Sequence, residues 1–405
     1  MPKTAIAGNR GEEIRSDCFV SLEMKTAGGI EIELNSRVKS IFGRTIIERC
    51  REVLHFFSVK NARVYIEDSG ALDFVLTARI EAAVLQLVET GKSYRPEVLP
   101  QNRYHIEKDR LRRSRLYLPG NTPKLMLNAG IHLPDGIILD LEDSVAPDRK
   151  AEARMLVRNA LCRVDFYGAE RMVRINQLPA GLEDLDVVVP CHVNLVLLPK
   201  CESAGQVRQV AERIDTILAQ HQLAYPVYLM PIIESALGVV NAYAIAAASE
   251  KVAALAIGLE DYTADIGARR TAEGRESFFA RSQVVNAARA AGVQPIDSVF
   301  SDVDNLDALQ TSARESKALG FDGMGCIHPR QIRVIHAAFS PDDAEIKQAW
   351  QIVLAFEEAG RLGLGVVALG SKMIDPPVVK RAQQILDLAV RLGKLDKDWR
   401  QHGGE

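Results

Sequence analysis

Apolar and polar residues follow two different patterns along the chain, and the change of pattern divides it into two blocks. In residues 1–92, a period of two predicts half-buried strands and a period of three to four predicts amphipathic helices. A hairpin turn is expected at residues 27–29, between the first two strands. The block therefore reads as a small α+β domain. Its predicted strands are residues 20–24, 30–34 and 64–66, and its predicted helices are residues 38–57 and 71–88.

From residue 113 onward, short apolar runs alternate with helical stretches. A strand followed by a helix, repeated many times, is typical of βαβ units and of a parallel sheet. Eight such runs favour a (β/α)8 TIM-type barrel over an open sheet, and no Gly-rich nucleotide-binding motif follows any of them. The fold class is therefore predicted to be α/β. The eight runs are residues 116–118, 136–141, 172–175, 193–198, 227–233, 252–259, 296–300 and 321–327.

Residues 93–112 follow neither of the two patterns. They contain Pro96, Pro100 and several basic side chains, with little periodic hydrophobicity. Such a composition is typical of a semi-extended linker, and a flexible linker of this length spans roughly 25 Å on average. We therefore expect a loose tether between the first domain and a barrel at residues 113–340. Residues 341–405 would then form a C-terminal helical lid or oligomerisation segment.

The composition excludes several classes of protein. Hydrophobic residues make up 47% of the 405 positions and charged residues 25%, which are globular averages and exclude a disordered chain. Fifty Lys and Arg against 53 Asp and Glu give a net charge of −3, too balanced for a general nucleic-acid or membrane-surface binder. No apolar run reaches the length that crosses a bilayer, and the N-terminus predicts no secretory signal. The six cysteines lack a metal-binding spacing, so reduced thiols in a cytoplasmic protein are expected.

Polar side chains follow the predicted strands at the points where the strands end. Glu142 comes after the second run, Arg174 after the third, Lys200 after the fourth, Glu234 after the fifth and Asp261 after the sixth. In a (β/α)8 barrel these ends form the active-site face. The alternative is that these residues only cap strands and start helices. Their number and variety favour a functional role.

Carboxylates from different strands, without nearby His or Cys clusters, indicate a hard cation. Magnesium takes one or two protein carboxylates and leaves its other positions to water and substrate oxygens. Glu234 and Asp261 are the best pair, and Arg174 offers a planar fork for a carboxylate or an oxyanion. Lys200 follows Pro199 and is as easily a capping charge, so no Schiff-base lysine is evident. The pattern favours metal-assisted enolate chemistry over imine chemistry.

Eight short motifs occur in order along the second block. They are residues 113–121 (RSRLYLPGN), 139–143 (LDLED), 173–176 (VRIN), 198–200 (LPK), 233–235 (IES), 258–262 (GLEDY), 327–331 (IHPRQ) and 370–375 (GSKMID). In this order they resemble the beta subunit of citrate lyase and the related malyl- and citramalyl-CoA lyases. Eight ordered motifs are far more specific than any one of them.

This resemblance implies roles for individual residues. Glu234 and Asp261 are the expected magnesium ligands, and Arg174, together with Glu234, is expected to hold the substrate. Glu142 is expected to orient water on the metal, as a catalytic carboxylate. Asp375, on the segment that resembles a lid, is expected to move the proton and to come from a neighbouring subunit.

Two further residues of the first motif and its neighbourhood are implied to bind substrate. Tyr117 and Lys124 resemble the residues of those lyases that contact the coenzyme A arm. They would serve a free CoA thioester and a protein-bound arm equally well.

The first block carries a resemblance of its own. Residues 7–8 (AG), 68–73 (DSGALD) and 78–81 (ARIE) resemble the gamma subunit of citrate lyase, the small acyl carrier protein of the same complex. In that family a serine just before the first strand carries a phosphoribosyl dephospho-CoA arm. Ser16, beside Asp17, is the nearest candidate here, and an unmodified hydroxyl is the alternative.

Both resemblances in one chain imply a magnesium-dependent lyase with its own carrier domain, which cleaves a citryl thioester to oxaloacetate and an acetyl thioester. One alternative is a free acyl-CoA lyase for citramalyl-CoA or malyl-CoA, with a vestigial first block. The other is a carrier or assembly subunit with an inactive barrel, against which the intact Arg174, Glu234 and Asp261 argue. The resemblance also implies a partner acyltransferase (alpha) subunit and a homo-oligomer, either a trimer or a hexamer.

Overall fold

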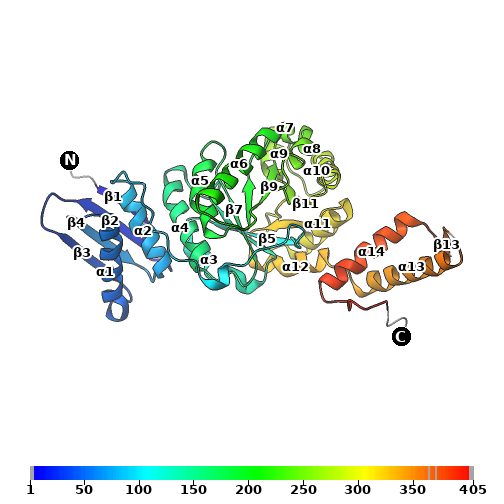
Figure 1. Cartoon of the computed structure of the whole chain (residues 1–405), viewed down its shortest axis with the longest axis horizontal. Helices are drawn as coiled ribbons and strands as arrows, with labels where there is room; N and C mark the ends of the chain where they lie inside the picture. Colours follow the sequence, from blue (N-terminus) through cyan, green and yellow to red (C-terminus); the bar gives the residue numbers. More distant parts are fainter. Residues whose placement is uncertain (1–3, 364, 370–371, 401–405) are drawn as a thin grey trace.

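The structure is a computed structural model that describes residues 4–363, 365–369 and 372–400. A four-stranded sheet with two helices comes first, a closed barrel of parallel strands follows, and a pair of long helices projects from the far side of the barrel (Figure 1). None of the helices within the described ranges combines the length and the apolar character needed to span a bilayer.

The N-terminal domain has the sheet order β1-β2-β4-β3, which corrects the predicted hairpin. β2 and β3 follow each other in sequence but do not pair, because β4 lies between them, antiparallel to β2 and parallel to β3. Gly28 and Gly29 do form a turn with positive φ, but the chain then continues into the edge strand. β1 had not been predicted. The elements are β1 (Thr4–Gly8), β2 (Cys18–Met24), β3 (Ile30–Ser36), α1 (Lys39–Phe56), β4 (Ala62–Asp68) and α2 (Asp73–Leu85).

Burial explains why β4 takes the central position. Ala62, Val64 and Ile66 of β4 are fully buried, whereas β3 exposes most of its side chains and suits a sheet edge. α1 connects β3 to β4 as a crossover, and such a connection returns the chain parallel to the strand that it left. A period of two therefore predicted both strands correctly but could not predict which strand each one pairs with.

The predicted (β/α)8 barrel is confirmed. Its strands are all parallel and close in the order of the sequence, with β12 paired to β5. The strands are β5 (Ser114–Pro119), β6 (Gly136–Asp140), β7 (Glu170–Arg174), β8 (Leu195–Leu198), β9 (Tyr228–Ile233), β10 (Ala254–Ile257), β11 (Gln294–Asp297) and β12 (Gly323–Cys326). The helices around them are α3 (Pro123–Met126), α4 (Lys150–Arg163), α5 (Gly181–Val188), α6 (Ala204–Gln220), α7 (Ala236–Val240), α8 (Ala242–Ala246), α9 (Leu259–Asp265), α10 (Phe278–Ala290), α11 (Leu306–Leu319) and α12 (Pro329–Phe339).

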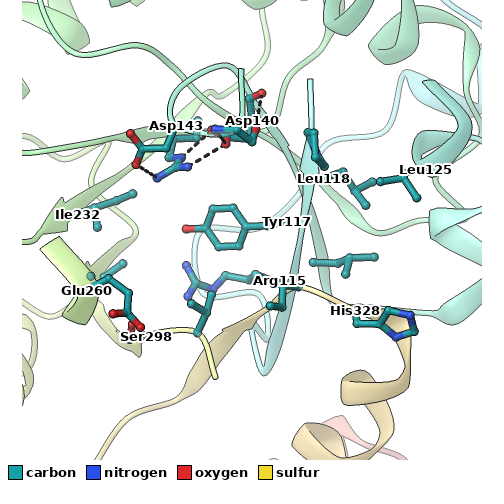
Figure 2. A pocket seen from close by; sticks show the side chains of 18 of the residues that line it. Arg115, Tyr117, Leu118, Leu125, Asp140, Asp143, Ile232, Glu260, Ser298 and His328 are labelled. Atoms are coloured by element: carbon teal, nitrogen blue, oxygen red, sulfur yellow. Dashed lines mark hydrogen bonds and ion pairs between the residues drawn. The ribbon is translucent and has the colours of Figure 1, made fainter. Parts of the chain in front are cut away.

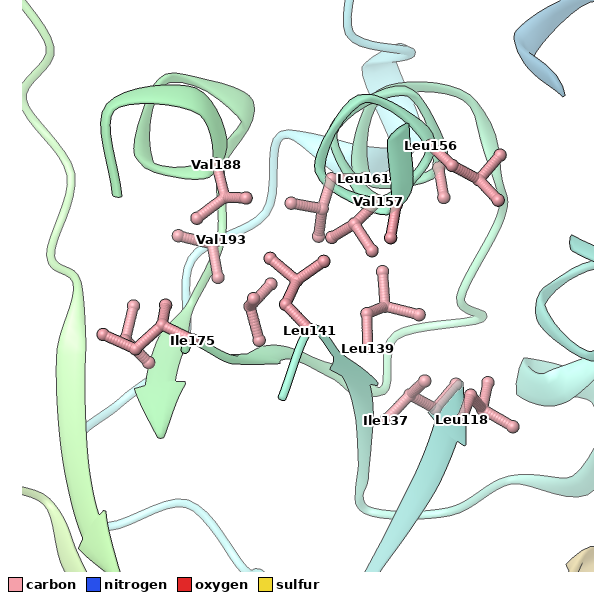
Figure 3. Close-up of a cluster of buried hydrophobic side chains, with 14 of the residues drawn as sticks. Leu118, Ile137, Leu139, Leu141, Leu156, Val157, Leu161, Ile175, Val188 and Val193 are labelled. Atoms are coloured by element: carbon pink, nitrogen blue, oxygen red, sulfur yellow. The ribbon is translucent and has the colours of Figure 1, made fainter. Parts of the chain in front are cut away.

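An apolar layer between strands and helices holds the barrel in shape. Leu139 and Leu141 from β6 and its end pack beneath Val157 and Leu161 of α4, with Val188 of α5 beside them (Figure 3). All five side chains are fully buried. The strands are buried on both faces, which is why each appears in the sequence as a continuous apolar run.

The N-terminal domain is fixed on the barrel through α2, which lies against α4 (Figure 1). Arg79 of α2 donates to both carboxylate oxygens of Asp17, at 3.0 and 2.9 Å, and to the carbonyl oxygen of Asn121 in the barrel, at 3.1 Å. Its Nη1 lies 3.6 Å from Glu152 of α4, which also accepts from the backbone N–H of Gly8 at 2.7 Å. All three charged side chains are buried in this contact between the two domains.

A second buried pair reinforces the same interface. Glu81 of α2 accepts from Arg158 of α4, with Oε1 2.9 Å from Nη1. Asn159 donates to the backbone carbonyl of Phe74, at 2.9 Å. Removing one member of a buried pair leaves the other charge uncompensated, which typically costs about 3–5 kcal/mol. The two domains are therefore held in one arrangement.

The connecting segment is not a free tether, so the expectation of a flexible linker is wrong. Apart from a short 3-10 turn at Pro100–Asn102, it has no regular structure, yet it packs along the barrel. Asn102 is fully buried and donates to the carbonyl oxygens of Leu161 and Val164. Arg112 is buried in a bidentate pair with Glu170, with both distances 2.8 Å. Polar and basic residues that suggested a solvated linker are thus used as anchors.

The C-terminal segment is a helical pair with a small core of its own. α13 (Asp343–Arg361) and α14 (Pro376–Arg391) enclose Val353, Leu386 and Trp399. The short hairpin of β13 (Val367–Leu369) and β14 (Lys372–Ile374) lies at the end farthest from the barrel (Figure 1). Gly370 and Ser371, which begin the last sequence motif, lie outside the described residues.

Candidate active site

A cavity of about 800 Å³ opens at the carboxyl ends of the barrel strands. Its wall combines apolar residues with charged groups from six strands or the segments that follow them (Figure 2). Five of the sequence-predicted site residues line it: Tyr117, Lys124, Arg174, Glu234 and Asp261. Strand ends that are far apart in sequence meet here because the parallel strands all end at the same rim.

Arg174 ends β7 and is held in place by two acidic residues. Its Nε and Nη2 donate to the two carboxylate oxygens of Asp140, at 2.6 and 2.8 Å. Its Nη1 lies 2.9 Å from Oε2 of Glu142. Burial alone would lower the pKa of Arg174, but the hydrogen bonds and charge of Asp140 outweigh burial and raise it. The guanidinium is therefore a permanent, oriented cation on the cavity wall.

Glu142 does not line the cavity but lies directly behind it. Its Oε1 accepts from the Nζ of Lys200 at 2.9 Å and from the side-chain amide of Gln177 at 3.1 Å. Its Oε2 is buried and accepts no hydrogen bond, although it faces the Arg174 guanidinium. This carboxylate is well placed to orient a group bound between Arg174 and Lys200.

Glu234 follows β9 and is almost fully buried. Its Oε1 accepts the backbone N–H of Lys200 at 2.6 Å. Burial, together with the nearby charges of Asp261 and Glu142, raises the pKa of Glu234 to about 7. A Cβ at position 258 would lie 2.5 Å from Oε2, so only glycine leaves room for this carboxylate.

The two predicted magnesium ligands differ in exposure. Asp261, in the first turn of α9, keeps 43% of its side chain exposed, whereas Glu234 is buried. Within the described residues, no three His, Cys, Asp or Glu side chains come together as a complete metal cage. A partly exposed and a buried carboxylate, with the buried Oε2 of Glu142 behind them, fit magnesium, which takes one or two protein carboxylates and keeps several waters and substrate oxygens.

Tyr117 and Lys124 lie on the first strand and the helix after it. The ring of Tyr117 sits inside the barrel with its centroid 5.4 Å from the Arg174 guanidinium carbon, and burial raises the pKa of Tyr117 (Figure 2). Lys124 belongs to α3 at the exposed mouth of the cavity. One is a wall residue and the other an exposed cation at the entrance.

The remaining two predicted residues lie away from the cavity of this chain. Asp375 accepts from the backbone N–H of Val378 at 3.1 Å, as the N-cap of α14. No described residue beyond Pro329 lines the cavity. Ser16 is half-buried, has a positive φ of 57°, and lies in the loop before β2. A proton-transfer role for Asp375 thus requires a second chain.

The structure also assigns positions that sequence analysis undervalued. Lys200, interpreted as a possible capping charge, points into the carboxylates. Its Nζ lies 2.9 Å from Glu142, 3.6 Å from Asp143 and 3.8 Å from Asp261. Its φ of +47° is unusual for a residue with a side chain, and such backbone outliers concentrate at functional sites. Arg115, which lines the cavity, belongs to the first sequence motif but had been given no role of its own.

The fold and the cavity define a (β/α)8-barrel enzyme with open carboxylates and a guanidinium at one substrate-sized opening. The chain belongs to the HpcH/HpaI aldolase/citrate lyase family, whose family model matches residues 113–329. It is therefore an enzyme of the lyase class. A second family model, an acyl carrier protein family described as malonate decarboxylase delta subunit, matches residues 3–87. This match confirms the acyl-carrier resemblance of the first block.

Individual relatives cover about 70% of this chain. The citrate lyase beta subunit of Leuconostoc mesenteroides subsp. cremoris is 38% identical over 289 residues, which cover 70% of this chain and 95% of that protein. The mitochondrial citramalyl-CoA lyase of Homo sapiens is 35% identical over 293 residues, covering 69% and 86%. The structure of CitE from Mycobacterium tuberculosis, in complex with magnesium, acetoacetate and coenzyme A, aligns with a TM-score of 0.57 and 31% identity, covering 69% and 98%.

Proposed function

We propose that the chain is a magnesium-dependent lyase that cleaves a citryl thioester to oxaloacetate and an acetyl thioester. The observation that carries this proposal is the cavity in which Arg174, Glu234 and Asp261 meet, inside a barrel 38% identical to a citrate lyase beta subunit. A free acyl-CoA lyase for citramalyl-CoA or malyl-CoA is the second candidate, favoured by the 35% identity to a citramalyl-CoA lyase.

The reaction breaks the bond between the carbinol carbon and the methylene carbon of the thioester. The tertiary hydroxyl loses its proton and becomes the ketone of oxaloacetate, while the bonding electron pair moves to the methylene carbon and forms an enolate. That carbon then takes a proton and becomes the methyl group of the acetyl thioester. A bound magnesium ion, held by Glu234 and Asp261, would acidify the hydroxyl and hold the carboxylate beside it.

The residues of the chain bind and orient around this step. Arg174 donates to the oxygen on which negative charge develops, and Asp140 and Glu142 keep its fork in one orientation. Glu142 and Lys200, 2.9 Å apart, would orient a water molecule or substrate oxygen beside Glu234. Tyr117 and Lys124 would position the thioester arm along the first strand. The apolar wall excludes bulk water from the enolate.

Asp375 would protonate the enolate carbon from a neighbouring subunit of a homo-oligomer, a trimer or hexamer. Glu234→Gln and Asp375→Asn oligomers are each expected to be inactive, but subunit exchange between them should restore activity. Random 1:1 assortment makes about one site in four intact if each site combines two chains. Turnover after mixing is the measurement. Mixtures that stay inactive, or a fully active Asp375→Asn enzyme, would exclude this role.

A phosphoribosyl dephospho-CoA arm on Ser16 is the proposed carrier of the acyl group, with a free CoA thioester as the alternative. The loop that contains Ser16 already contacts the barrel. Asn9 donates to Asp17 at 2.8 Å and approaches the carbonyl oxygen of Asn121 at 3.4 Å. Asn121 lies between Pro119 and Lys124, both of which line the cavity. The fixed domain would therefore present its arm at one side of the cavity mouth.

Loading of Ser16 predicts intramolecular cleavage. Citryl-loaded wild type should release oxaloacetate in a single turnover at a rate independent of protein concentration, because effective concentrations of tethered groups are on the order of millimolar. Ser16→Ala should accept no arm and lose this activity, but should still cleave free citryl-CoA weakly. Intact-protein mass and single-turnover kinetics provide the measurements.

The matched control is Ser21→Ala, which removes a hydroxyl from the following strand and should retain the arm. If Ser16→Ala equals wild type in mass and in turnover of every thioester, the carrier assignment is wrong. The free acyl-CoA lyase then becomes the better reading.

The domain division follows from the same proposal. Residues 1–92 would be the acyl-carrier-like domain, 93–112 the connecting segment, 113–340 the lyase barrel and 341–405 the C-terminal lid. An acyltransferase alpha subunit would exchange the acyl group on the arm, so that the lyase site receives the citryl form. A carrier or assembly subunit with an inactive barrel is disfavoured by the assembled Arg174–Asp140 and Lys200–Glu142 pairs.

A further inference from the structure

Arg115 is a charged side chain in the apolar interior of the barrel. Residues alternate along a strand, so Leu116 and Leu118 of β5 pack outward while Arg115 and Tyr117 face inward. Other strands of the barrel turn apolar residues such as Ile138, Met172 and Ile232 into the same interior cluster. Branched apolar side chains are the usual filling of such a barrel. An arginine at this depth therefore needs an explanation.

The guanidinium of Arg115 has no anionic partner among the described residues, although only 1% of the residue is exposed. Its Nη1 donates to the sulfur of Met230 at 2.9 Å, and its Nη2 to the carbonyl oxygen of Asp297 at 3.3 Å. Its Nε is buried with no hydrogen-bond partner. Burial lowers the pKa of Arg115, as expected for a cation without a counter-charge.

Asp297 of β11, whose backbone carbonyl accepts from Arg115, has its carboxylate occupied elsewhere. Oδ2 of Asp297 accepts from Arg281 at 2.5 Å and from the hydroxyl of Ser316 at 2.6 Å. Three of the other fully buried arginines are paired with a carboxylate, as Arg112 is with Glu170 at 2.8 Å, whereas Arg171, outside the cavity, is bonded to Asn194 and to the carbonyl oxygen of Tyr104. A buried, unpaired guanidinium costs folding free energy. A ligand that supplies the missing negative charge would compensate for this cost.

The position of Arg115 tells which ligand group could reach it. Arg115 lines the cavity next to Tyr117 (Figure 2), and the guanidinium carbon of Arg174 lies 5.4 Å from the centroid of the Tyr117 ring. Two guanidinium groups therefore face one cavity. Ala256, a small residue, leaves room beside them on the cavity wall. Arg174 already has carboxylate partners in the protein, so Arg115 is the guanidinium for which a second carboxylate on the acyl chain would supply the counter-charge.

The candidate substrates differ in that second carboxylate. The carbinol carbon of a citryl thioester carries a carboxymethyl group, where a citramalyl thioester has a methyl group and a malyl thioester a hydrogen. We propose that Arg115 is a specificity-determining residue that binds this carboxymethyl group and selects citryl thioesters. The proposal rests on the lyase function proposed above. A planar fork that binds a carboxylate bidentately suits this role, and the weak contact to the Met230 sulfur is easily exchanged for it.

Substrate discrimination tests the proposal. Free citryl-CoA and citramalyl-CoA are compared in the magnesium-loaded wild type and in Arg115→Met, so that the result does not depend on Ser16. We expect kcat/KM for citryl-CoA to fall by at least about a hundredfold, because a site built to bind a polar group loses this much discrimination without it. For citramalyl-CoA it should stay within about threefold, since the methyl group makes no such contact. Arg115→Lys should retain part of the preference.

The control variant is Arg171→Met, which removes another buried arginine, one bonded to Asn194 and outside the cavity. It should lower the unfolding temperature without changing the ratio of the two kcat/KM values. Equal losses on both substrates in Arg115→Met, or no loss on either, would overturn the proposal.

Product binding separates this proposal from the lyase function. Wild type should bind oxaloacetate more tightly than pyruvate in calorimetry with magnesium, and Arg115→Met should bind both alike. If wild type cleaves neither thioester, the lyase function fails, and this binding difference still decides the role of Arg115. Equal binding of the two keto acids by wild type overturns it.

Discussion

Glu234→Gln and Asp261→Asn should each reduce magnesium-dependent cleavage by at least about a thousandfold, because a metal Lewis acid contributes several kcal/mol to such a transition state. Each change removes one of the two carboxylates that are proposed to hold the ion. The fold should survive, because Asp261 is partly exposed and Gln at position 234 can still accept the Lys200 N–H. Steady-state turnover and calorimetric magnesium binding are the measurements.

The matched control for this pair is Glu202→Gln. Glu202 accepts from the hydroxyl of Ser235 at 2.7 Å, next to Glu234 in sequence, but does not line the cavity. It should retain magnesium binding and turnover. Magnesium affinity that is unchanged in both Glu234→Gln and Asp261→Asn would refute the assignment of the metal ligands.

Arg174→Lys should lower turnover by about two to three orders of magnitude, the usual cost of losing an oriented donor to a developing oxyanion. Lysine keeps the charge but cannot make the two parallel hydrogen bonds to Asp140 while also reaching the substrate. The loss should appear in kcat more than in KM, because the interaction strengthens in the transition state.

Arg154→Lys provides the corresponding control. Arg154 pairs with Asp184 at 2.7 Å on the outside of the barrel, so its replacement tests the loss of an Arg–Asp pair alone. It should leave turnover near that of wild type. Near-full turnover of Arg174→Lys would mean that Arg174 serves only as a salt-bridge partner.

The barrel was predictable because its strands are buried on both faces. Each of the eight apolar runs overlaps a strand, and the order of the runs is the order around the barrel. The N-terminal sheet was less predictable, since alternation reports which face of a strand is buried but not its neighbour. β4 lies between β2 and β3 because the α1 crossover returns the chain to that position. No local residue pattern specifies this long-range pairing.

The site residues that lie at strand ends were predicted from the sequence. Tyr117, Arg174, Glu234 and Asp261 meet because parallel strands bring their carboxyl ends to one rim. Lys200 was undervalued, because its reach to Glu142 depends on a left-handed backbone conformation that sequence does not reveal. Arg115 was overlooked because it follows a run of basic residues and resembles the end of a linker.

The docking of the first domain was unpredictable for a similar reason. Arg79 and Glu81 belong to a motif that marks the carrier family, but the motif says nothing of their partners on α4. Those partners lie more than seventy residues away in sequence, and only the folded chain brings them together.

The buried ion pairs between α2 and α4 determine what happens when the N-terminal domain is removed from the barrel. A barrel cut free of its first 92 residues would expose Glu152, Arg158 and Asn159 on α4, each deprived of the partner that it has in the intact chain. Such a fragment would expose unpaired polar groups on α4, and its unfolding temperature would be lower. Its failure to turn over substrate would therefore reflect damage to the barrel, not the absence of a carrier. Dependence on the carrier is best read from single substitutions in the full chain.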